Sequence, residues 1–154
     1  MRFLRFAIRD AAVLGLTALA WRRDRTAGPS FAGALAGGLT ALTGFLAHEW
    51  GHLAGTALSG GYAHEPDNLT SPFLFFFDTT RSDRRSFLWM SYSGYAATVA
   101  ASAAIVWFAP RDRWSGTVAR GATVLGAIAT LALEIPTTVR VARGGDFPTG
   151  FVYR

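Results

Sequence analysis

The sequence SFLWMSYSGYAATVAASAAIVWFA, residues 86–109, contains 24 residues without a single charged side chain. As a helix it would be long enough to cross the hydrocarbon core of a bilayer, which is about 30 Å thick. Core helices of water-soluble domains rarely stay uncharged for this length. The stretch therefore predicts a membrane-spanning helix, which ends before Pro110.

Three further hydrophobic segments accompany this stretch, at about residues 6–21, 30–59 and 116–139. Half of the chain is hydrophobic (51%) and only 16% is charged, which leaves too little polar surface for a water-soluble fold of 154 residues. Gly60 and Gly61 should end the second segment, and Pro136 should kink or end the fourth. We predict an all-α membrane protein, with one transmembrane domain over residues 1–154 and a bundle of about four transmembrane helices.

The first segment also fits a secretory signal peptide, because it has a basic start, a short apolar middle and the small-residue sequence Ala18-Leu19-Ala20. Arg9 and Asp10 shorten its charge-free part. The Arg-rich sequence at 21–25 favours a retained anchor, since the translocated side of a cleavage site is usually poor in arginine.

All fifteen basic side chains are arginine, the net charge is +5, and the arginines cluster between the apolar segments. This distribution is typical of anchors that flank membrane helices, and it disfavours a nucleic-acid-binding surface. If all four segments cross, nine arginines lie on the side of the termini and six on the other. We therefore expect an integral, multi-pass protein of a bacterial cell membrane with cytoplasmic termini.

The connection between the second and third segments is unusually apolar at 73–77, between Pro72 and Asp78. Such a loop either re-enters the bilayer or forms a strand. Because irregular backbone exposed to lipid leaves its polar groups unpaired, this stretch must pack on protein or line a cavity.

The sequence His48-Glu49-Trp50-Gly51-His52 lies inside the second segment and fits the pattern HExxH. Two imidazoles four residues apart on a helix point to one side and can share a Zn²⁺ ion. Glu49 is then a candidate general base for a water molecule that the metal activates. Ionisable groups within a membrane segment are costly and are usually functional.

Small residues precede this motif at helical spacing, which predicts a face where another helix approaches closely. Gly33 and Gly37 form a GxxxG pair on this face, and Gly44, Gly51 and Gly55 continue it toward and past the histidines.

A catalytic zinc site needs a third protein ligand and a position open for water. Because the chain contains no cysteine, that ligand must be a histidine or a carboxylate. The candidates are His64, Asp67, Asp78, Glu134 and Asp146.

The HEWGH helix, the helix containing Ser93-Gly94-Tyr95, and a later segment with a proline and a Gly-Asp turn resemble the site-2 protease family of intramembrane zinc metallopeptidases. The resemblance covers about residues 30–146. It implies that His48 and His52 bind zinc, that Glu49 is the catalytic base, that Asp146 is the third ligand, and that the substrate is a membrane protein or peptide. Glu134 is the second candidate, since other HExxH enzymes take their third ligand from a glutamate on a late helix.

Two other functions are compatible with the same residues. One is a zinc hydrolase that acts on a lipid-linked or small amide substrate. The other is a non-catalytic membrane scaffold, in which the histidines and Glu49 only hold helices together by hydrogen bonds.

Overall fold

The computed structural model describes residues 3–146, in which the regular elements are four helices and one short two-stranded hairpin. The four predicted helices are confirmed, each within a few residues of its expected limits. The elements are α1 (Leu4–Arg23), α2 (Phe31–Ser59), β1 (Ala63–His64), β2 (Phe76–Phe77), α3 (Arg84–Phe108) and α4 (Trp114–Ala142).

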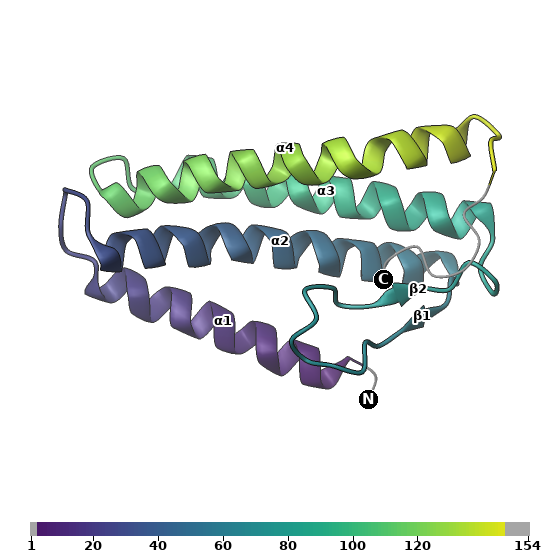
Figure 1. Ribbon diagram of the computed structural model, residues 1–154, viewed down its shortest axis with the longest axis horizontal. Coiled ribbons are helices and arrows are strands. Elements are labelled where there is room, and N and C mark those ends of the chain that lie inside the picture. Colours follow the sequence, from purple (N-terminus) through teal and green to yellow (C-terminus); the bar gives the residue numbers. More distant parts are fainter. Residues whose placement is uncertain (1–2, 147–154) are drawn as a thin grey trace.

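The helices form an elongated bundle in which neighbours along the chain run in opposite directions (Figure 1). Helix α2 is the central element, since it packs against α1, α3 and α4, while α3 and α4 also pack on each other. The hairpin lies at the end of the bundle where α2 ends and α3 begins, beside the start of α1 (Figure 1). This arrangement surrounds the HEWGH sequence with other helices.

Local capping explains where α2 and α3 begin and where α2 ends. Ser30 caps α2 by accepting a hydrogen bond from the backbone N–H of Gly33 (2.9 Å), and Asp83 caps α3 by accepting one from Ser86 (2.7 Å). Gly60 ends α2 with a left-handed backbone at φ 77°, a conformation that favours glycine. The expectation that Gly60 stops this helix is confirmed.

Helix α4 continues through Pro136 to Ala142, so the proline does not end the helix. Pro136 removes only one backbone donor, the one that would bond to the carbonyl group of Ala132. A contact after the proline holds the last turns in place, because the hydroxyl of Thr138 lies 2.5 Å from that of Tyr95, across the interface with α3. The tertiary packing therefore outweighs the local cost of the proline.

The predicted small-residue face of α2 is confirmed as a site of close helix contact. A Cβ atom added at Gly37 would lie 2.6 Å from Val118 of α4, and one added at Gly51 would lie 2.5 Å from Ala97 of α3. At Gly55, the added atom would lie 2.4 Å from the carbonyl oxygen of Trp89. Larger side chains at these glycines would push α3 and α4 away from the histidines.

The apolar loop packs on protein, as expected, and part of it forms a strand. Strands β1 and β2 are antiparallel, with Ala63 opposite Phe77 and His64 opposite Phe76. The buried side chains that gather here come from α1, the loop, α3 and α4, and they are Phe6, Leu74, Phe75, Phe77, Phe87, Met90 and Val141. This core holds the loop against the bundle.

Two of the helices in the described part of the chain, α2 and α4, are long and apolar enough to cross a membrane. Helix α3 contains the charge-free stretch, but serine and tyrosine side chains lower its mean hydropathy below theirs. Membrane association therefore has support from two helices. Crossing by all four helices stays a prediction.

The hairpin carries a carboxylate whose titration can be measured. Asp78 accepts hydrogen bonds from the hydroxyl (2.6 Å) and backbone N–H (2.9 Å) of Thr80, and its other oxygen lies 2.9 Å from Nε2 of His64. These interactions favour the ionised form and lower the pKa of Asp78 from 3.8 to about 2.

A lowered pKa means that the carboxylate stabilises the hairpin above about pH 4 and loses this effect as the pH falls toward 2. We expect the side-chain ¹³C resonances of Asp78 to titrate with a midpoint near 2, and Thr80→Val to raise that midpoint. A midpoint near 4 in the unchanged protein would contradict these hydrogen bonds.

Candidate metal centre

The two histidines of the HEWGH sequence face the same point inside the bundle. His48 and His52 are 2% and 1% exposed, and their Nε2 atoms lie 2.9 Å apart. The spacing of four residues puts both rings on the face of α2 that packs against α3 and α4, as the sequence predicted.

The other nitrogen of each ring contacts a group that accepts a hydrogen bond. Nδ1 of His52 lies 2.9 Å from the carbonyl oxygen of Met90, which can only accept. Nδ1 of His48 lies 2.8 Å from the hydroxyl of Thr98, which itself donates to the carbonyl oxygen of Gly94 and so accepts from the histidine. In its neutral form, each imidazole therefore carries its hydrogen on Nδ1 and a lone pair on Nε2.

Glu134 of α4 brings a carboxylate to these two lone pairs. Its Oε1 lies 3.1 Å from Nε2 of His48, and its Oε2 lies 3.3 Å from Nε2 of His52. Oε2 is buried and has no hydrogen-bond partner within residues 3–146. The ligand atoms of the three residues all lie within 4.8 Å of one another.

A cation bound between these three side chains would remove the electrostatic repulsion among them. Two nitrogen lone pairs and a carboxylate that face one another repel, and a buried carboxylate oxygen without a partner is costly. A proton on one imidazole satisfies only one of these contacts, whereas a divalent cation satisfies all three side chains at once. His48, His52 and Glu134 therefore form a group that could hold a metal ion.

Glu49 lies beside this group. It is 4% exposed, its Oε1 is 4.0 Å from Nε2 of His48, and its Oε2 accepts a hydrogen bond from the backbone N–H of Leu74 at 2.9 Å. The apolar loop thus fixes the orientation of the carboxylate. Glu49 thus lies next to the group of possible metal ligands but is not part of it.

The structure brings Glu134, and not Asp146, to the two histidines, so Asp146 as the third ligand stays a prediction without support from the geometry. Asp146 is exposed and follows the end of α4 at Ala142. It lies about three helical turns beyond Glu134 along the chain. Because α4 continues through Pro136, the residues after the proline move away from the centre of the bundle toward its end.

The remaining candidates also lie outside the group. His64 and Asp78 pair with each other in the hairpin, and Asp67 is an exposed residue of the loop that precedes β2. None of these three belongs to the cluster of possible metal ligands found in the described residues.

The hydrogen bonds that connect α1 to the HEWGH sequence and to the apolar loop were not predicted from the sequence. Asp10 is 5% exposed and accepts a hydrogen bond from Nε1 of Trp50, inside the HEWGH sequence, at 2.8 Å. Arg9 pairs with Asp10 at 2.7 Å and donates to the carbonyl oxygens of Leu69 (3.2 Å) and Ser71 (2.7 Å). Two charges within an apolar segment were the signal that could have found them.

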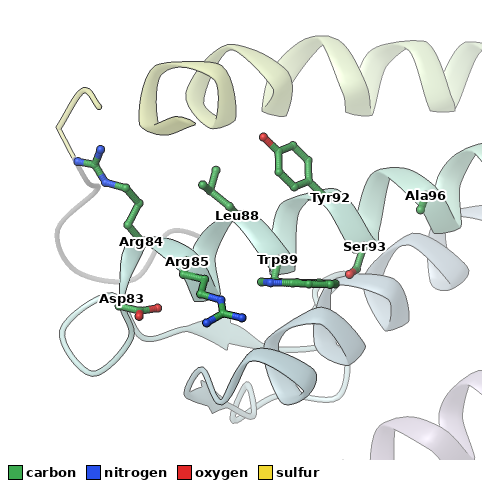
Figure 2. Close-up of a pocket in the computed structure, with 8 residues that line it drawn as sticks. All are labelled: Asp83, Arg84, Arg85, Leu88, Trp89, Tyr92, Ser93 and Ala96. Atoms are coloured by element: carbon green, nitrogen blue, oxygen red, sulfur yellow. The ribbon is translucent and has the colours of Figure 1, made fainter. Parts of the chain in front are cut away.

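A groove of about 900 Å³ is separate from the possible metal ligands. It follows the first turns of α3, where Tyr92 points toward α4 and Trp89 points to another side of the helix (Figure 2). Its lining is mainly apolar, with Arg84 and Arg85 at one end. His52 instead meets the opposite face of α3, at Met90 and Gly94.

An added methyl group at Gly94 should directly disturb His52, one of the possible metal ligands. A Cβ atom there would lie 2.3 Å from Cε1 of His52, so the ring must move. We expect Gly94→Ala to lower the free energy of unfolding by about 1–3 kcal/mol, as overpacking does, and to weaken metal binding.

Gly121→Ala on α4 is the matched control, because a Cβ atom added there meets nothing within 4 Å. Thermal unfolding in detergent and a metal titration of both variants measure the effect. Equal metal affinity in the two variants would show that His52 is not held where α3 places it.

No protein-family model, curated protein or solved structure matches this chain.

Proposed function

We propose that this protein is a membrane-embedded zinc metallopeptidase, in which His48, His52 and Glu134 bind the metal and Glu49 acts as the general base. The observation that carries the proposal is that the carboxylate of Glu134, distant in the sequence, lies beside the imidazole nitrogens of His48 and His52. The carboxylate of Glu49 lies 4.0 Å from Nε2 of His48. The resemblance of the HEWGH sequence to site-2 proteases supports the same reaction.

Zinc is the proposed metal, because it suits these ligands. Two imidazoles and one carboxylate form a common set in catalytic zinc sites, where three protein ligands leave a fourth position open. Hard cations such as Mg²⁺ and Ca²⁺ prefer oxygen ligands, which are the minority here. The hydrogen bonds from Nδ1 of each ring also orient the histidines as outer partners do in zinc enzymes.

When bound, zinc polarises a carbonyl group and lowers the pKa of a coordinated water to about 7. Glu49 takes a proton from the attacking water, whose oxygen then bonds to the carbonyl carbon of the substrate. Glu49 next gives that proton to the amide nitrogen, and the C–N bond breaks to leave a carboxylic acid and an amine. The Leu74 N–H holds the carboxylate in position for both transfers.

A peptide bond in or beside a transmembrane segment is the proposed substrate, because the metal ligands lie within α2 and α4, the two helices apolar enough to cross a membrane. The excess of arginine near the hairpin end of the bundle supports a cytoplasmic location for that end. The proposal also includes that all four helices cross the membrane and that this membrane is a bacterial cell membrane.

The test is the metal content and the peptidase activity of protein purified in detergent. We expect about one zinc per chain, and cleavage of a membrane-segment peptide that a chelator stops and zinc restores. Protein that binds zinc but cuts no peptide would favour a hydrolase of lipid-linked or small amide substrates. Protein without zinc would favour the scaffold.

A further inference from the structure

A small cavity of about 60 Å³ lies between α2, α3 and α4, next to the metal ligands. His48 and Gly44 of α2 line it, together with the hydroxyl-bearing residues Thr98, Ser102, Thr123 and Thr130. Hydroxyl groups thus come from α3 and α4, in a part of the bundle where most of the other lining residues are alanine or glycine.

Thr123 gives the clearest sign of what this cavity contains. Its side chain is 4% exposed, and its hydroxyl oxygen is buried with no hydrogen-bond partner in the part of the chain that the structure describes. A hydroxyl group buried without a partner is unfavourable, so a polar molecule in the cavity would satisfy it. The volume is enough for about two water molecules.

The cavity also touches the residues that orient the metal ligands. Thr98 lines it and accepts the hydrogen bond from Nδ1 of His48, and its oxygen has a further lone pair for a water molecule. Thr130 lies one helical turn before Glu134 on α4. Water in the cavity would therefore lie beside His48 and within about one helical turn of Glu134.

We propose that this cavity is an internal water site, which keeps a small store of water beside the metal centre. The need for such a store follows from the membrane location, because hydrolysis consumes one water molecule per turnover and the surrounding hydrocarbon contains almost none. The role in supplying water rests on the proposed hydrolase function. The presence of water does not.

Two variants remove the water in different ways. Thr123→Val keeps the shape of the side chain and deletes the unpartnered hydroxyl. Gly44→Ala adds a methyl group that fits, since its Cβ atom would lie 3.4 Å from Ile105 and 3.7 Å from Thr123. The matched controls are Thr117→Val, an exposed position on α4, and Gly38→Ala, where an added Cβ atom meets nothing within 4 Å.

A crystal structure that resolves ordered water should contain water within hydrogen-bonding distance of the Thr123 hydroxyl, and the two cavity variants should lose it. We expect kcat for peptide cleavage to fall about tenfold in both, as for other groups just outside a metal site, with KM and zinc content unchanged. The controls should match the unchanged protein.

A cavity that is dry, or filled by a lipid chain, would overturn the inference. Water that is present while both variants keep the kcat of their controls would overturn its role in supply. If the unchanged protein cleaves nothing, the proposed function fails, but the crystal structures still decide whether the cavity holds water. Because Gly44→Ala places its methyl group without a clash, it keeps the test valid if Thr123→Val folds poorly.

Discussion

Glu134→Gln is expected to weaken zinc binding by more than about 100-fold, while Asp146→Asn leaves it unchanged. Loss of an outer partner of a metal ligand already costs about 10- to 100-fold in affinity, and Glu134 is proposed as a ligand itself. Its carboxylate lies 3.1 and 3.3 Å from the two Nε2 atoms, whereas Asp146 is exposed beyond the end of α4. The measurement is a competitive zinc titration against a chelator of known affinity.

Thermal unfolding separates a lost ligand from a failure to fold. Zinc at 100 times its dissociation constant should raise the free energy of unfolding by about 2.7 kcal/mol in the unchanged protein and in Asp146→Asn. Glu134→Gln should show almost no shift at the same concentration while its metal-free form still unfolds cooperatively. Tight zinc binding by Glu134→Gln, together with its loss in Asp146→Asn, would restore Asp146 as the third ligand.

Glu49→Gln is expected to lower kcat by about 10²- to 10⁴-fold, the usual contribution of a general base. The amide has nearly the shape of the carboxylate and can still accept the hydrogen bond from Leu74, but it cannot take a proton from water. Because Glu49 is not one of the three proposed metal ligands, the zinc content of the variant should stay near one per chain.

Comparison of these two variants distinguishes the proposed metal ligand Glu134 from the proposed general base Glu49. Glu134→Gln should lose both zinc and activity, and Glu49→Gln should lose activity alone. Initial rates of peptide cleavage, measured with the zinc content of the same sample, give both quantities. If Glu49→Gln cleaves as fast as the unchanged protein, another group transfers the proton and the proposed mechanism is wrong.

The local part of the site was predictable because it depends on spacing along one helix. Four residues separate His48 from His52, which places both rings on one face of α2 wherever that helix packs. The glycines on the same face, such as Gly51 and Gly55, indicated a close neighbouring helix, and α3 packs there. The ends of α2 followed in the same way from Ser30 and Gly60.

The partners that reach the site from a distance were not predictable in this way. Leu74, which holds Glu49, lies in a loop whose path depends on the buried core that it shares with α1, α3 and α4. Asp10 looked like an interruption of an apolar segment, and only its position opposite Trp50 gives it a role.

The sequence by itself determined four helices, the two histidines on one face of the second, and an apolar loop that had to be covered by protein. Only the tertiary structure decided which carboxylate meets the histidines. Spacing within a helix specifies direction over a few residues, but the register between α2 and α4 comes from packing, as at Gly37 against Val118. That register carries Glu134 to the imidazoles and leaves Asp146 at the end of the bundle.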